Sequence, residues 1–221
     1  GLAAIEDVEA HVFTPRPPEF EVPAGARLHP GGASGWLVEG TWASVNVPRM
    51  ARREGVELLH YLWPTGHFAS SPPYVVTVHD ALNYELPLYR QSPAVELALR
   101  QMVRGARKVI TVSETAAGAI ASAYDLPPDR LAPVLLGIRA QRPRPAGDRG
   151  DWWLFMGGIE RRKNLAAALE AWHLLPEPRD PLQVVGVLAP SERHYTRGEL
   201  VGLGSEGVER RGFVSPEELD E

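Results

Sequence analysis

Short runs that contain several apolar residues recur along the chain and predict β-strands, and the run Tyr74–Val78 shows no polar alternation. Eight such runs occur, at Val8–Phe13, Val56–Tyr61, Tyr74–Val78, Val109–Val112, Leu131–Leu136, Trp152–Met156, Leu182–Leu188 and Val208–Val214. Strands that are apolar throughout are typical of parallel sheets covered by helices on both faces.

Amphipathic segments alternate with these runs and predict helices. Ser92 and Pro93 begin the clearest helix, and Gly105 is its expected end. Ser113 is placed to cap a second helix. Three further helices are expected: a short one over Pro48–Arg53, one marked by Leu165, Leu169, Trp172 and Leu175, and one opened by a capping box at Ser215, Pro216 and Glu218.

The alternation of strands and helices predicts an α/β protein with two Rossmann-like parallel-sheet units. The residues between Arg139 and Gly150 are rich in Arg, Pro and Gly and contain almost nothing apolar. We therefore expect an N-terminal domain over 1–140, a linker over 141–150, and the start of a second domain over 151–221. Ligands of such sheets bind beyond the carboxyl ends of the strands.

The region Thr14–Gly40 is rich in Pro and Gly and is expected to be irregular loop. It contains His29-Pro30-Gly31-Gly32, which no predicted strand precedes, and we interpret this stretch as a flexible connection. Gly202-Leu203-Gly204-Ser205-Glu206-Gly207 matches a dinucleotide fingerprint in form, but it too lacks a preceding strand and is rejected as one.

Composition narrows the classes of partner and of chemistry. The net charge is -5, so nucleic acid is not an expected partner. The chain has no cysteine, which excludes disulfides, zinc–thiolate sites and cysteine nucleophiles. Its histidines show no ligand spacing, so neither a metal site nor a cofactor is expected. No apolar run reaches the roughly 20 residues that span a bilayer, and no secretory signal is recognised. We expect a cytoplasmic protein, either free or in peripheral contact with the inner face of the membrane.

The segment Gly157–Asn164 is the strongest candidate for chemistry. Gly157 and Gly158 follow a predicted strand directly, and the consecutive cations Arg161, Arg162 and Lys163 precede a predicted helix. Glycines permit close approach of a ligand to the backbone, and the helix N-terminus adds to the positive field. The segment is suited to a diphosphate, although a solvated basic turn would have the same composition.

A second candidate is the pair His79-Asp80, which ends the strand Tyr74–Val78. A histidine at that position can bond a sugar hydroxyl or exchange a proton near neutral pH. The alternative is a histidine that orients its loop through Asp80. For Thr111-Val112-Ser113-Glu114, a strand followed by a capped helix explains the sequence, and no functional role is expected.

Taken together, these segments resemble glycosyltransferase family 4, a group of retaining GT-B enzymes. The segments that carry the resemblance are, in order, Gly55–His60, Val76–Asp80, Ala106–Glu114, Val134–Ile138, Phe155–Leu165 and Gly212–Leu219. The resemblance implies that Arg162 and Lys163 hold the donor diphosphate in place of a metal ion. It also implies that His79 contacts the transferred sugar and that Phe213 and Val214 lie against the nucleotide base.

The expected reaction is transfer of a hexose, with retention, from a nucleoside diphosphate sugar to a carbohydrate or lipid-linked acceptor. The phosphate segment favours GDP-mannose over a UDP-sugar as the donor. The chain departs from the family by lacking a Gly-rich loop after a first strand and a downstream pair of glutamates, so it is expected to be incomplete at both ends. Two alternatives remain open: a non-catalytic nucleotide-sugar-binding fragment or subunit, and a GT-B nucleotide-sugar epimerase that would use His79 and Asp80.

Overall fold

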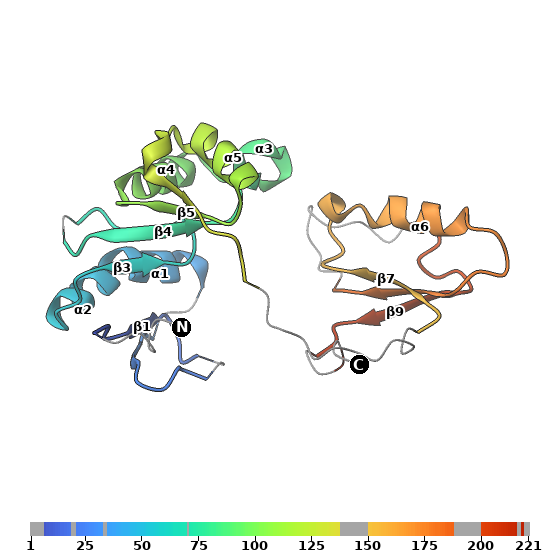
Figure 1. Cartoon of the computed structure of the whole chain (residues 1–221), viewed down its shortest axis with the longest axis horizontal. Helices are drawn as coiled ribbons and strands as arrows, with labels where there is room; N and C mark the ends of the chain where they lie inside the picture. Colours follow the sequence, from blue (N-terminus) through green and yellow to red (C-terminus); the bar gives the residue numbers. More distant parts are fainter. Residues whose placement is uncertain are drawn as a thin grey trace. The chain divides into compact units, whose positions relative to one another are not determined.

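The computed structural model describes residues 7–18, 21–32, 35–69, 71–137, 150–187, 200–215 and 218. The chain divides into two compact units, Gly1–Ile138 and Arg139–Glu221, and each is described by itself (Figure 1). Most of the expected linker, 141–150, lies outside the described residues. Every strand pair within the described ranges is parallel, so the protein is a mixed α/β protein with Rossmann-like parallel sheets.

The main sheet of unit 1 has four strands in the order β3-β4-β5-β6. These strands are β3 (Leu59–Tyr61), β4 (Tyr74–Val78), β5 (Val109–Thr111) and β6 (Leu131–Pro133). Helices α3 (Leu82–Glu85), α4 (Pro93–Gly105) and α5 (Glu114–Tyr124) follow β4 and β5 along the chain. Figure 1 shows α4 and α5 on one side of this sheet and α1 and α2 on the other. Val76 and Val78 are fully buried between these layers, as expected for strands covered on both faces.

Several elements form where local signals predict them. Helix α4 begins at Pro93 and ends at Gly105. The Ser113 hydroxyl accepts a hydrogen bond from the Ala116 N–H at 3.0 Å, which caps α5. The capping box is also present, because the Ser215 N–H bonds the Glu218 carboxylate at 2.7 Å and the Glu218 N–H bonds the Ser215 hydroxyl at 3.2 Å. These signals depend on neighbouring residues alone.

The prediction of irregular loop over Thr14–Gly40 is wrong in part. Strand β2 (Arg27–Pro30) lies within it and pairs in parallel with β1 (His11–Thr14). The stretch beginning at His29 is therefore the end of a strand rather than a flexible connection. Three of the four β2 residues are exposed, so backbone pairing rather than apolar burial makes this strand, and its sequence lacks the usual pattern.

The helical segment before β3 is longer than predicted. Helix α1 (Trp36–Thr41) leads through a π-helical turn (Trp42–Asn46) into α2 (Val47–Arg53). Pro48 has no N–H to donate, and the Val47 N–H bonds the Trp42 carbonyl across a wider turn. The proline that predicted a helix start lies within a continuous helical run.

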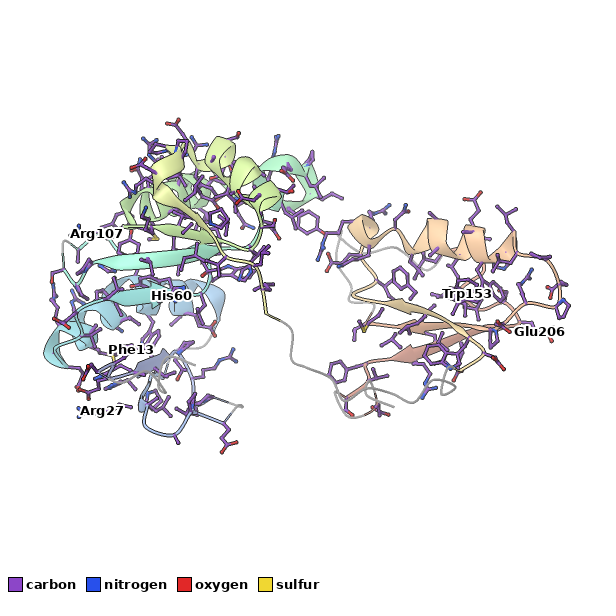
Figure 2. The ribbon with its side chains drawn as sticks, in the orientation of Figure 1. Phe13, Arg27, His60, Arg107, Trp153 and Glu206 are labelled. Atoms are coloured by element: carbon purple, nitrogen blue, oxygen red, sulfur yellow. The ribbon has the colours of Figure 1, made fainter. Side chains whose placement is uncertain are left out.

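Unit 2 contains a three-stranded sheet in the order β7-β8-β9. These strands are β7 (Trp153–Met156), β8 (Leu182–Val185) and β9 (Val208–Gly212), and α6 (Leu165–His173) packs Leu165, Leu169 and Trp172 against Leu182 and Val184. Strand β7, predicted to be buried, has Trp153, Leu154 and Met156 about half exposed, and Figure 2 labels Trp153. Within the described residues, no helix is long and apolar enough to cross a membrane.

Candidate functional site

The parallel strands of unit 1 place their following residues at one edge of the main sheet. Leu62 and Trp63 follow β3, His79 and Asp80 follow β4, and Ser113 follows β5. Because all these strands run in one direction, the candidate pair His79-Asp80 lies at the edge where open α/β sheets bind their ligands.

His79 is exposed and is oriented by the neighbouring strand connection. Its Nε2 atom lies 3.3 Å from the Leu62 carbonyl oxygen, which can only accept, so this contact requires the proton on Nε2 and, in the neutral ring, leaves the lone pair on Nδ1. The Trp63 ring lies beside it, with centroids 6.1 Å apart. His79 therefore offers a hydrogen-bond acceptor next to an aromatic face.

Asp80 has a different partner. Its Oδ1 atom accepts a hydrogen bond from the Leu82 N–H at 3.1 Å. This is the local turn that an aspartate forms before a helix, and it fixes the entry to α3. The two side chains of the predicted pair thus act on separate neighbours, and Asp80 shapes the loop that holds His79.

Trp63 is a candidate that the sequence prediction missed. The residue is 69% exposed, although a large aromatic ring usually buries most of its surface. The signal in the sequence was a tryptophan two residues after a predicted strand, at the same edge as His79. On β3, His60 is labelled in Figure 2. Its Nε2 atom lies 2.8 Å from the Thr77 hydroxyl, and partial burial lowers the pKa of His60.

A pocket of about 490 Å³ lies elsewhere in unit 1, between the helical segment Gly40–Arg52 and the connection that leads into β4. Its walls are mainly apolar and include Val45, Phe68 and Met102, with Arg49 and Arg52 beside them. Phe68 precedes β4 whereas His79 follows it. The pocket is therefore separate from the candidate pair.

In unit 2, the glycine-rich turn after β7 is held against β8. The Gly157 N–H donates to the Val185 carbonyl at 3.0 Å, and the Ile159 N–H donates to the Val187 carbonyl at 3.2 Å. Gly157 has a φ of 145°, a conformation that L-residues avoid. A Cβ atom at Gly186 would overlap the Gly157 carbonyl oxygen. Gly186 is a second residue that the sequence prediction missed, since nothing in its own segment indicates this contact.

The three cations form a single 3₁₀ turn, Arg161–Lys163, directly before α6. The Lys163 side chain lies across Gly157, because a Cβ built at Gly157 would be 3.7 Å from its Cδ and Cε atoms. Arg162 Nε bonds Glu160 Oε2 at 2.8 Å. Arg161 and Lys163 are exposed, as is Arg162. A basic surface thus surrounds the glycines at the carboxyl edge of the unit 2 sheet.

Phe213 and Val214 follow β9 and lie at this same edge of the sheet. Phe213 is 80% exposed, and the Gly186 N–H bonds the Gly212 carbonyl at 2.8 Å. The structure therefore brings the ends of β7, β8 and β9 together at one edge, with a cationic turn at one end of it and an exposed aromatic ring at the other.

Comparison with known families identifies the chain. The sequence profile of Glycosyltransferase Family 4 matches residues 1–142, which is more than half of the 221 residues. No curated protein matches the chain. The match covers His79 and Asp80, whereas the cationic turn lies beyond it. With parallel α/β sheets and this match, the chain belongs to glycosyltransferase family 4.

Proposed function

We propose that the protein is a retaining GT-B glycosyltransferase that moves a hexose from a nucleoside diphosphate sugar to an acceptor hydroxyl. In this proposal unit 2 binds the donor and unit 1 binds the acceptor. The observation that carries it is the cationic turn Arg161–Lys163 beside Gly157 at the carboxyl edge of a parallel sheet. Membership of the family accounts for glycosyl transfer as the general activity.

The donor diphosphate would lie against the backbone of Gly157 and Gly158. Both glycines leave the main chain open to a close ligand, and the N-terminus of α6 adds positive potential. Lys163 and Arg162 would offset the charge that develops on the diphosphate as the bond to the sugar breaks. No metal ion is required in this arrangement.

Glu160 would lower the affinity of the site for the diphosphate, because its carboxylate is already paired with Arg162. A bound diphosphate carries more negative charge than one carboxylate, so it competes with Glu160 for the guanidinium group. Arg161 and Lys163 contribute further positive charge in the same turn. We therefore expect donor binding to weaken as salt is added.

The nucleotide base would stack on Phe213, with Val214 beside it. An exposed aromatic ring at the ligand-binding edge offers such a surface. Base identity is not encoded by a stacking contact, so GDP-mannose and a UDP-sugar are both donors to be assayed.

In unit 1, His79 would contact the transferred sugar through Nδ1, and Trp63 would present its face to a sugar ring of the acceptor. Asp80 would act by holding the turn that orients His79. A carbohydrate or the sugar portion of a lipid-linked acceptor fits these groups, because hydroxyls bond the imidazole and C–H faces pack on indole.

The donor site is tested by calorimetric titration of GDP and UDP into the wild type and into a variant with Arg162→Ala and Lys163→Ala. We expect affinity to fall at least about 10-fold, since two charge-assisted contacts are lost. Single variants allow a matched comparison. Lys163→Ala and Arg210→Ala each remove one exposed cation from unit 2. Because Arg210 lies within β9 and outside the cationic turn, Arg210→Ala should leave the nucleotide affinity unchanged, whereas Lys163→Ala should lower it. Equal affinities in all variants would reject the phosphate site.

The role of His79 is tested with His79→Ala, assayed for hexose transfer from GDP-mannose and UDP-glucose. We expect unchanged GDP and UDP affinity and reduced turnover, because the histidine lies in unit 1 and the phosphate site in unit 2. Release of free nucleotide without sugar transfer, together with a sugar product of changed configuration, would favour the epimerase instead. Donor binding without any turnover, including in a longer form of the protein, would favour a non-catalytic subunit.

A further inference from the structure

Two histidines meet where β1 and β2 pair, although they are 18 positions apart in the chain. The parallel register aligns His11 with Arg27 and Phe13 with His29. Alternate residues share a face of a strand, so His11 and His29 lie on one face, and the labels on Phe13 and Arg27 locate this small sheet in Figure 2. His11 Nδ1 and His29 Nε2 are 3.0 Å apart.

A third potential ligand comes from the end of α2. The carboxylate of Glu54 lies close to both histidines, and one ligand atom from each of the three residues falls within 4.8 Å of the other two. Glu54 is exposed, so its carboxylate can adjust without unpacking the core. Two imidazole nitrogens and one carboxylate oxygen therefore converge from three separate elements.

The contacts behind His11 suit a metal ligand. Its Nε2 atom lies 3.4 Å from Glu9 Oε1, and the same oxygen accepts a bond from Arg27 Nη2 at 2.8 Å. A carboxylate on one ring nitrogen keeps the proton there and leaves the lone pair on the other nitrogen. This carboxylate–histidine arrangement is common behind metal ions in proteins.

Packing restricts both rings. The His11 side chain is only 6% exposed, and Phe13 stacks on His29 with centroids 4.7 Å apart and planes 16° from parallel. Ligands whose rotamers are already fixed lose little freedom when an ion binds.

We propose that His11, His29 and Glu54 bind a divalent first-row transition-metal ion of the Zn²⁺ class. Imidazole and carboxylate together suit zinc, and a water molecule completes the coordination of a three-ligand site. The site is separate from the proposed transfer site, because Glu54 precedes β3 whereas His79 follows β4.

Ion binding requires three adjustments: the proton that His29 Nε2 shares with His11 Nδ1 must move to His29 Nδ1, the Glu54 carboxylate must approach from within 4.8 Å, and the two rings must shift. Zinc–nitrogen bonds of about 2.0–2.1 Å in tetrahedral geometry place two nitrogens about 3.3 Å apart, compared with 3.0 Å between His11 Nδ1 and His29 Nε2. The ring planes are 7° from parallel, and the two nitrogens face each other, so each ring must also tilt toward the ion.

The ion would stabilise the two-stranded sheet of β1 and β2. A two-stranded sheet is marginally stable alone, and the strands β1 and β2 each have four residues. An ion bound to both strands and to Glu54 would cross-link them to the end of α2. Its expected effect is on the stability of unit 1 rather than on sugar chemistry.

The test is calorimetric titration of Zn²⁺ into the full chain without an affinity tag, with Co²⁺ absorption spectra to report the geometry. We expect one equivalent of ion per chain. His29→Gln should weaken Zn²⁺ binding at least about 100-fold, and Glu9→Gln about 10-fold, because Glu9 only orients a ligand. His173→Gln removes a histidine of unit 2 and should leave the Zn²⁺ affinity unchanged.

Circular dichroism melting guards against misfolded variants. Zn²⁺ should raise the melting temperature of the wild type and of His173→Gln, but not of His29→Gln. Glu54→Gln changes an exposed side chain, so it should keep the fold and still weaken Zn²⁺ binding at least about 10-fold. Absence of stoichiometric binding, or binding unchanged in both His29→Gln and Glu54→Gln, would overturn the proposal.

Discussion

His67 is a buried polar residue that links two parts of unit 1. It is 3% exposed, its Nε2 atom lies 3.0 Å from the Pro72 carbonyl, and its Nδ1 atom lies 2.9 Å from the Tyr61 hydroxyl. Tyr61 also bonds the Ala43 carbonyl at 3.1 Å, within the π-helical turn. The ring therefore joins the connection before β4, strand β3 and the helical segment.

We expect this burial to make the free energy of unfolding of unit 1 depend on pH. Desolvation lowers the pKa of His67, and the Arg52 charge acts in the same direction against the hydrogen bond to Pro72. The unfolded chain binds a proton near pH 6.5, whereas the folded chain binds it only at lower pH. Stability should therefore be full above about pH 6.5 and should decrease as the pH falls toward the folded pKa.

The measurement is the melting temperature of the wild type and of His67→Gln at pH 7.5 and pH 5.5. The glutamine variant should be less stable at both values but should lose less on acidification. Partial burial also lowers the pKa of His60, so some loss should persist in the variant. An equal loss in both proteins would contradict the role of His67.

Gly186 gives a second prediction at the scale of single residues. Gly186→Ala would push a methyl group into the Gly157 carbonyl at a φ of 155°, so we expect a loss of about 3 kcal/mol in the stability of unit 2. Gly204→Ala is the matched control, since no atom lies within 4 Å of its Cβ position. Urea unfolding followed by tryptophan fluorescence measures both, and equal stabilities would refute the close approach.

At the scale of elements, the start and cap signals of α4 and α5 are confirmed, whereas Pro48 lies inside a longer helical run and strand β2 has no signal in its own sequence. Pro93 and Gly105 bound α4 as predicted, because caps and helix starts are local features. Strand β2 has little apolar burial and was missed. The contacts of His11 with His29 and of Gly157 with Gly186 arise only from strand pairing, so no spacing along the chain could indicate them.

The cap of α5 offers a test of one local signal. Ser113→Ala removes the acceptor of the Ala116 N–H and should destabilise unit 1 by about 1 kcal/mol. Ser113→Asp keeps an acceptor oxygen and should retain most of that stability. Urea denaturation of the three proteins gives the comparison, and an unchanged midpoint for Ser113→Ala would show that the cap contributes nothing.

At the scale of the whole molecule, the two units have separate hydrophobic cores, one around β4 and one beneath α6. Separate cores can melt in separate transitions, and a ligand stabilises only the unit that binds it. Calorimetric scans should therefore resolve two transitions. GDP or UDP, whichever binds, should raise the melting temperature of unit 2, and Zn²⁺ should raise the melting temperature of unit 1.

Two variants show which unit each transition belongs to, and no activity assay is needed. Lys163→Ala should abolish most of the nucleotide shift and leave the Zn²⁺ shift, while His29→Gln should do the reverse. At 100 times its dissociation constant a ligand adds about 2.7 kcal/mol, which moves the melting temperature of a small unit by several degrees. A single transition raised by both ligands would mean that the two units unfold together. A ligand that stabilised the other unit would contradict the site proposed for it.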